Sequence, residues 1–169
     1  MKVLVLPGYS IQNRDWAIQV AEYLKSDFDT KVIEWEHWNG TDNGGLNVSA
    51  ECLRIENEMG DEKVNLVAKS IGTLVSMQLL QSKKDKIAKV ILLGIPTTDL
   101  SETDKQTYQV LAAWPIDKLM VIQNMADNHG SADQVQQFLT GINGAIKVLV
   151  KDRADHEYPY LAEFADFLK

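Results

Sequence analysis

Six short runs of valine, isoleucine and leucine, separated by longer segments of mixed polarity, constrain the fold of this chain more than any other feature. The runs occupy residues 3–6, 31–35, 64–68, 90–93, 119–123 and 146–150. Apolar residues in these runs do not alternate with polar ones, which is typical of parallel strands that are covered on both faces. The sequence therefore predicts six mostly parallel strands.

The segments between the runs carry apolar residues at helical spacing. We expect helices over residues 15–25, 49–59, 71–81, 102–112, 131–139 and 160–168, with Ser49 and Ser131 as N-caps. A regular alternation of strand and helix predicts an α/β fold, a doubly wound six-stranded sheet with helices on both faces. We expect a single domain over residues 1–169, in which the polar stretch 39–45 is a loop.

The composition narrows the class of partner. Hydrophobic residues make up 45% of the chain and charged residues 24%, as in an ordinary globular protein. The formal net charge of −7 argues against nucleic acid and against anionic membranes, because both require a basic surface. We expect a small-molecule substrate, and the oligomeric state stays open.

Cysteine content and the first apolar run suggest a cytoplasmic protein. Cys52 is the single cysteine, so no intramolecular disulfide can form, and its helical surroundings favour a buried structural thiol. The first apolar run stops at Pro7-Gly8, too short for a signal sequence, and no stretch approaches the ~20 apolar residues of a membrane helix.

Active sites of parallel sheets form beyond the carboxyl ends of the strands, so the residues that follow each strand are the candidates for chemistry. Ser70 follows the third strand and opens a helix, with Ala68 two residues before it and Gly72 two residues after it. Small residues at these positions are typical of a nucleophile elbow, a tight turn that exposes the serine hydroxyl. The alternative is that Ser70 only caps the helix.

The loop after the first strand is a candidate oxyanion hole. Pro7-Gly8 there precedes Tyr9 and Ser10, and we expect the backbone N–H of Tyr9, or else that of Ser10, to stabilise an oxyanion. The second donor would be the N–H of Ile71, directly after Ser70. A plain Pro-Gly turn would explain the first loop equally well if it were considered alone.

Two later loops supply an acid and a base. Asp127 follows the fifth strand and His156 follows the sixth, so the order along the chain is serine, aspartate, histidine. Asp99, after the fourth strand, is the competing acid. His129 lies on the same loop as Asp127, and we expect it at the surface or in a supporting position rather than as the base.

With these motifs in place, the chain resembles the α/β-hydrolase superfamily in its compact, capless form, from the first strand to the last helix. Its order of serine, acid and histidine is the one found in that superfamily. Pro7 stands where a histidine often precedes the oxyanion-loop glycine, and Ala68 replaces a glycine of the elbow. We expect the two leading antiparallel strands of the family to be absent from this sequence.

The resemblance implies a serine hydrolase that cleaves a small ester or thioester-like substrate through an acyl-enzyme. Ser70 would be the nucleophile, His156 the base and Asp127 the acid. We expect no cofactor and no metal, because the zinc-binding spacings are absent from the sequence. A non-catalytic binding protein on the same scaffold is the alternative, whereas a nucleotide-binding domain is disfavoured because the glycine-rich phosphate motifs are absent.

The connection from residue 95 to residue 117 must contain its own crossover helix, so it leaves little chain for a lid. We therefore expect an open site, although residues 36–48 could form a loop over one rim of it. Trp16, Trp38, Trp114 and Tyr9 could line a pocket, although buried aromatic residues belong to the core more often.

Overall fold

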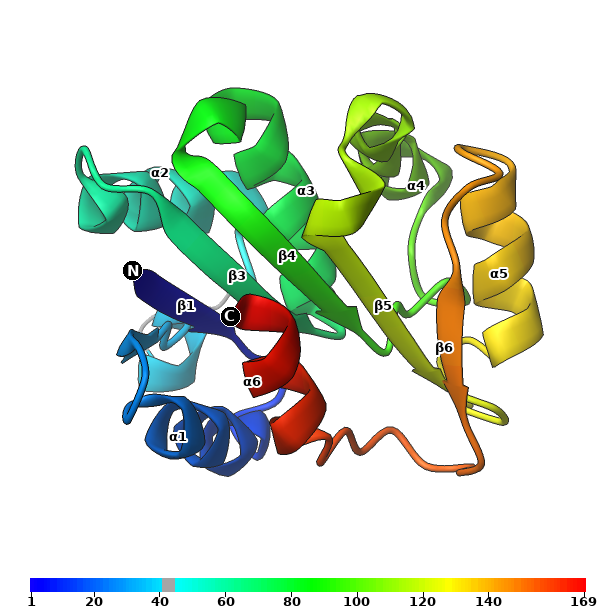
Figure 1. The fold of residues 1–169 in the computed structure, drawn as a ribbon, viewed down its shortest axis with the longest axis horizontal. Coiled ribbons are helices and arrows are strands. Elements are labelled where there is room, and N and C mark those ends of the chain that lie inside the picture. The colour runs from blue at the N-terminus through cyan, green and yellow to red at the C-terminus, as the bar shows by residue number, and fades with distance from the viewer. Residues whose placement is uncertain (41–44) are drawn as a thin grey trace.

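The computed structural model describes residues 1–40 and 45–169. Strands and helices alternate along the chain (Figure 1). The strands are β1 (Lys2–Leu6), β2 (Asp29–Val32), β3 (Val64–Lys69), β4 (Ile87–Leu93), β5 (Leu119–Asn124) and β6 (Val148–Lys151). The α-helices are α1 (Asn13–Leu24), α2 (Val48–Met59), α3 (Ile71–Lys83), α4 (Glu102–Thr107), α5 (Ala132–Thr140) and α6 (Leu161–Leu168).

The strands form one sheet in the order β2-β1-β3-β4-β5-β6, and every neighbouring pair is parallel. The carboxyl ends of all strands therefore meet at one edge of the sheet. β3 lies near the centre, between β1 and β4, so the residues that follow it are surrounded by the loops of its neighbours. The expected α/β architecture is confirmed.

The two faces of the sheet carry separate hydrophobic cores. Side chains alternate along the strands, so that Leu4 and Leu6 of β1 pack on one face while Val3 and Val5 pack on the other. Helices α2, α3 and α5 cover the first face, and α1 and α6 cover the second (Figure 1). Helices on both faces are confirmed.

The edge strands differ from the expected ranges because they are less apolar than the central ones. β2 begins at Asp29 and ends at Val32, so it shares only residues 31–32 with the run that was expected to form it, and its exposure alternates along the strand. Ile33 and Trp35 are fully buried but lie beyond β2, in the chain that leads back toward the core. An edge strand is covered on fewer sides, so it tolerates polar residues that a search for apolar runs misses.

Two local predictions are wrong, and a third lies mostly outside the described residues. The N-cap of α2 is Asn47, whose side chain accepts from the N–H of Ala50, and Ser49 lies inside the helix. The helix expected over residues 102–112 ends at Thr107 and continues as 3₁₀ turns over Tyr108–Ala113. Of the polar stretch 39–45, residues 41–44 lie outside the described part of the chain.

Other local predictions are confirmed. Ser131 caps α5 through a capping box with Gln134, and each side chain bonds the backbone of the other residue. Cys52 is buried, and burial raises the pKa of its thiol to about 12, which suits a structural role. Among the described residues, no helix is both long and apolar enough to cross a membrane.

Candidate active site

Ser70 occupies a strained turn between β3 and α3. Its backbone dihedrals are φ 54° and ψ −122°, and within the described ranges no other non-glycine residue has a positive φ. The N–H of Ser70 donates to the carbonyl oxygen of Leu93 at 2.8 Å, which ties the turn to β4. The Ser70 side chain makes no capping hydrogen bond to α3, so helix capping does not explain the serine at this position.

Close contact between two backbone segments explains the small residue after Ser70. A Cβ atom on Gly72 would lie 2.4 Å from the carbonyl oxygen of Leu6 and 2.9 Å from that of Pro7. Real Cβ atoms do not approach backbone oxygens so closely, so only glycine allows α3 to start against the end of β1. Ala68 is fully buried in β3, paired with Leu6 and Leu92 of the neighbouring strands.

Aromatic side chains orient the peptide groups of the loop after β1. The indole N–H of Trp35 donates to the carbonyl oxygen of Gly8 at 3.0 Å. The carbonyl oxygen of Tyr9 accepts from the indole N–H of Trp38 at 2.8 Å and from Nε2 of His37 at 2.9 Å. In a trans peptide the N–H points away from the carbonyl, so these contacts turn the N–H groups of Tyr9 and Ser10 away from the three rings.

Two of the expected oxyanion donors carry free N–H groups. Within the described part of the chain, the backbone N–H of Tyr9 and that of Ile71 have no hydrogen-bond acceptor. The N–H of Ile71 belongs to the first turn of α3, where intrahelical acceptors do not exist. Both groups are therefore available to an oxyanion.

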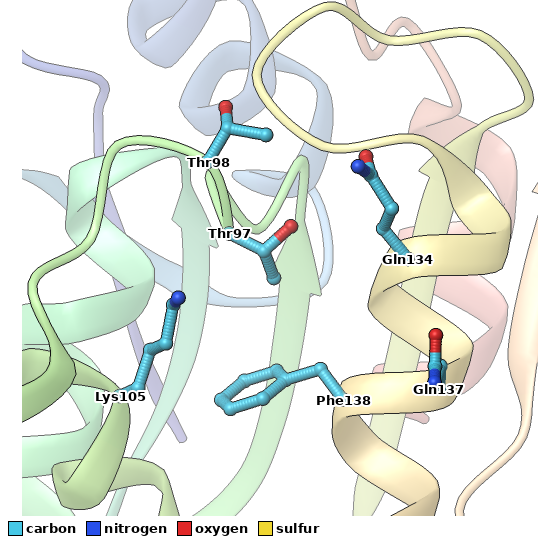
Figure 2. Close-up of a pocket in the computed structure, with 6 residues that line it drawn as sticks. All are labelled: Thr97, Thr98, Lys105, Gln134, Gln137 and Phe138. Carbon is cyan, nitrogen blue, oxygen red and sulfur yellow. The ribbon is translucent and has the colours of Figure 1, made fainter.

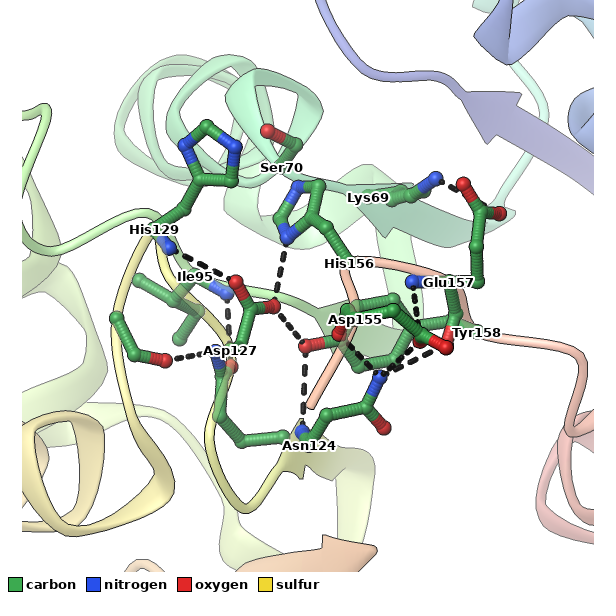
Figure 3. A network of polar contacts seen from close by, with 12 residues as sticks. Lys69, Ser70, Ile95, Asn124, Asp127, His129, Asp155, His156, Glu157 and Tyr158 are labelled. Carbon is green, nitrogen blue, oxygen red and sulfur yellow. Dashed lines mark hydrogen bonds and ion pairs between the residues drawn. The ribbon is translucent and has the colours of Figure 1, made fainter. Parts of the chain in front are cut away.

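The structure places His156 against Asp127. Nδ1 of His156 lies 2.6 Å from Oδ2 of Asp127. The other ring nitrogen, Nε2, is buried and has no hydrogen-bond partner among the described residues. Figure 3 shows that His156 lies between Asp127 and Ser70, with this free nitrogen on the Ser70 side of the ring.

Three donors converge on the Asp127 carboxylate, whose side chain is fully buried. Besides His156, the hydroxyl of Tyr158 donates to Oδ2 at 2.6 Å and the N–H of His129 donates to Oδ1 at 2.9 Å. Burial alone would raise the pKa of Asp127, but these three hydrogen bonds hold it below its ordinary value. Asp127 is therefore a carboxylate at neutral pH.

Asp99, the competing acid, contacts a different histidine. Its Oδ2 lies 2.5 Å from Nδ1 of His129, and both side chains are partly exposed. The rings of His129 and His156 are in contact, with centroids 4.5 Å apart. Thus the structure brings Asp127, and not Asp99, to His156.

Lys69, directly before Ser70, is a buried cation that the sequence did not indicate. Its side chain is 2% exposed, and its Nζ lies 2.8 Å from Oδ1 of Asn13 and 3.5 Å from a carboxylate oxygen of Glu157. Burial lowers the pKa of Lys69, and the carboxylate of Glu157 opposes that shift. Since Asn13 packs against Gly8, Lys69 connects the loop after β1 to the loop that carries His156.

Sequence reasoning also missed Tyr158, which is fully buried and bonds both Asp127 and the N–H of Asn124. Its position two residues after His156 is the only sequence signal that could have indicated it. Lys69 offered no signal, because lysine is among the residues least often buried.

Ser70 is not enclosed by the residues that the structure describes. Ser70 is itself partly exposed, and the connection from residue 95 to residue 117 packs down on the core through the buried side chains of Tyr108, Leu111 and Trp114. A pocket of about 280 Å³ lies nearby, between α4 and α5 (Figure 2). Its walls are formed by Thr97, Thr98, Lys105, Gln134, Gln137 and Phe138, so it is separate from Ser70.

The aromatic residues that were considered as pocket-lining residues lie elsewhere in the structure. Trp16 and Trp114 are buried in the two cores, Trp38 holds the loop after β1, and Tyr9 is 52% exposed. In the described ranges, no group of three or more histidine, cysteine, aspartate or glutamate side chains is placed to hold a metal ion.

Comparison with known proteins identifies the family. A family model described as alpha/beta hydrolase fold matches residues 10–123, about two thirds of the chain. This chain belongs to the alpha/beta hydrolase fold family. No curated protein matches it in sequence.

Solved structures with low sequence identity share the fold of this alpha/beta hydrolase. An alpha-beta serine hydrolase homologue from Coxiella burnetii superposes with a TM-score of 0.73 at 18% identity, covering 99% of this chain and 83% of the other. An a/b serine hydrolase without lid from Xanthomonas campestris gives 0.65 at 14% identity, covering 99% and 78%. A deformylase from Pseudomonas putida gives 0.68 at 13%, covering 99% and 90%.

Proposed function

We propose that this protein is a serine hydrolase that cleaves small ester or thioester-like acyl substrates through an acyl-enzyme. Ser70 is the nucleophile, His156 the general base and Asp127 the acid that orients it. One observation carries the proposal: Nε2 of His156 is buried without a partner, on the Ser70 side of a ring that Asp127 holds through Nδ1. A buried nitrogen without a partner costs free energy, so its orientation needs a functional reason.

The first half of the reaction forms the acyl-enzyme. The carboxylate of Asp127 accepts the Nδ1–H of His156, so the neutral ring presents a lone pair at Nε2. Nε2 takes the proton of the Ser70 hydroxyl while Oγ attacks the carbonyl carbon. The tetrahedral intermediate collapses when Nε2 returns that proton to the leaving group, which departs as an alcohol or thiol.

The second half releases the acid. Water gives its proton to Nε2 of His156 and attacks the acyl carbon, and the proton then returns to Oγ of Ser70. In both halves the negative charge on the carbonyl oxygen is stabilised by the N–H groups of Tyr9 and Ile71, which are free to donate. Removal of one such donor typically lowers kcat by about 10²- to 10³-fold.

The open surroundings of Ser70 support a preference for small acyl groups. A buried methylene contributes about 0.8 kcal/mol, but only while a wall is present to cover it. Since the connection over residues 95–117 packs on the core, it supplies no such wall. We therefore expect kcat/KM to stop improving after the first few acyl carbons.

A panel of p-nitrophenyl esters from acetate to laurate tests the proposal, with Ser70→Ala as the matched blank. The proposal expects hydrolysis that depends on Ser70 and levels off at short chains. A steady rise in kcat/KM to laurate would contradict the open, lidless site. Hydrolysis absent from every ester would favour the alternative, a binding protein on a hydrolase scaffold.

A further inference from the structure

A second histidine–aspartate pair lies against the proposed catalytic pair. Nδ1 of His129 lies 2.5 Å from Oδ2 of Asp99, and the His129 ring is tilted by 52° against that of His156, with the centroids 4.5 Å apart. The mechanism proposed above uses neither the side chain of His129 nor Asp99. Their place next to His156 therefore calls for a separate explanation.

The His129 backbone is fixed on both sides. Its N–H donates to Oδ1 of Asp127 at 2.9 Å. Its carbonyl oxygen accepts from the N–H of Thr98 at 3.1 Å and from the hydroxyl of the same residue at 2.8 Å. With Asp99 on Nδ1, the imidazole is held in one orientation beside the His156 ring although its side chain is 40% exposed.

Stability does not account for this arrangement. The Asp99 and His129 side chains are 56% and 40% exposed, and ion pairs as exposed as this contribute little to folding. Rigid placement of an exposed polar group beside a reactive one is instead what a substrate-binding position requires.

The tautomer of His129 determines what it can bind. A carboxylate only accepts hydrogen bonds, so the contact with Asp99 places the ring proton on Nδ1. The neutral ring then presents a lone pair at Nε2. Figure 3 shows this Nε2 edge of the ring on the side that faces Ser70, and in the described part of the chain no group donates to it.

We infer that His129 is a specificity-determining residue whose Nε2 accepts a hydrogen bond from a hydroxyl group on the substrate, close to the scissile bond. The substrate class is then the small hydroxy esters. The inference rests on the proposed function and adds the chemical character of its substrate. Asp99 acts through His129, as a positioning residue that fixes the acceptor tautomer.

Two pairs of substrates, matched in size, test this inference. Phenyl glycolate and phenyl propanoate differ by a hydroxyl or a methyl group in the acyl part. 2-Hydroxyethyl propanoate and propyl propanoate differ in the same way in the leaving group. The measured quantity is the ratio of kcat/KM within each pair, so intrinsic reactivity cancels when variants are compared.

In at least one pair, the ratio of kcat/KM for the hydroxy ester to kcat/KM for its matched ester should be higher in the wild type than in His129→Phe. The expected difference is about 3- to 10-fold, the range of one partly solvated hydrogen bond. Asp99→Ala should lower the ratio part of the way, because the ring can then carry its proton on either nitrogen. Asp133→Ala, which removes an exposed aspartate of the first turn of α5, should leave the ratio at the wild-type value.

Equal ratios in the wild type and His129→Phe, with all four esters cleaved in a Ser70-dependent manner, would overturn the inference and leave the proposed function intact. If none of the four esters is cleaved in a Ser70-dependent manner, both the proposed function and this inference are wrong.

Discussion

The hydroxyl of Tyr158 donates a hydrogen bond at 2.6 Å to Oδ2 of Asp127, the same oxygen that contacts Nδ1 of His156. The Tyr158 oxygen also accepts from the N–H of Asn124 at 3.2 Å. Burial, together with the bond to Asp127, raises the pKa of Tyr158 far above its ordinary value, so the phenol remains a donor at neutral pH. Tyr158 thus fixes the carboxylate that orients His156.

Tyr158→Phe should lower the free energy of unfolding by about 1–3 kcal/mol at neutral pH, because a buried N–H and a buried carboxylate each lose a partner. Part of this loss depends on pH. Since the pKa of Asp127 is lowered in the folded protein, its stabilising contribution is present above the ordinary value of 3.8 and is lost as the pH falls through the folded pKa. Removing the Tyr158 hydrogen bond moves the pKa of Asp127 in the folded protein upward. The difference in unfolding free energy between the wild type and Tyr158→Phe should therefore be smaller at about pH 3 than at neutral pH.

Urea denaturation at the two pH values measures this difference. Tyr160→Phe is the matched control, since the hydroxyl of Tyr160 donates to Oδ1 of Asn124 and not to Asp127. A deficit that is the same at both pH values in Tyr158→Phe would contradict the electrostatic part of the account.

Asp127→Asn should lower kcat by about 10³- to 10⁴-fold, because an amide can hold the imidazole in the wrong tautomer and cannot stabilise the imidazolium. The corresponding change at Asp99 should cost about 10-fold or less, since that carboxylate contacts His129 rather than His156. Steady-state kinetics on one p-nitrophenyl ester compares the two variants. A larger loss in Asp99→Asn would move the acid to the loop after β4.

The turn at Ser70 should store strain that glycine relieves. At φ 54° and ψ −122° a residue with a Cβ atom is strained by about 1–3 kcal/mol, and glycine avoids this strain. Glycine also makes the unfolded chain more flexible, which lowers the free energy of unfolding by about 0.5–1 kcal/mol. Ser70→Gly should therefore be about 1 kcal/mol more stable than Ser70→Ala. Thermal unfolding of the two variants decides the matter, and an alanine variant of equal or greater stability would show that the turn is unstrained.

Gly72→Ala should be strongly destabilising, because the added methyl group meets the backbone oxygens of Leu6 and Pro7 rather than side chains that can move away. Overpacking of this kind costs about 1–3 kcal/mol. Gly144→Ala is the control, as a Cβ there meets nothing within 4 Å. Similar unfolding free energies for the two variants would refute the close contact between β1 and α3.

The sequence predicted the features of this molecule that depend on neighbouring residues and on strand order. The N-cap at Ser131 is local, and the positions of Ser70, Asp127 and His156 follow from the rule that parallel strands end at one edge of the sheet. The cap of α2 was misplaced because Asn47 and Ser49 are equally suitable cap residues, and only the path of the chain distinguishes them.

The contact between Asp99 and His129 lay beyond sequence reasoning, although the position of Asp127 favoured it as the acid for His156. Asp99 and Asp127 both follow strands, and only the folded loops determine which of them contacts which histidine. Burial of Lys69 was equally inaccessible, because it depends on Asn13 and Glu157, which are distant in sequence and converge only in the folded chain.

The central claim, that Ser70 is a nucleophile activated by His156, is tested most directly by covalent labelling with a fluorophosphonate followed by peptide mapping. The account predicts a single adduct on Ser70, no adduct in Ser70→Ala, and labelling slowed by about 10³-fold or more in His156→Ala. Absence of an adduct on the folded wild-type protein, or an adduct that persists in Ser70→Ala, would contradict it.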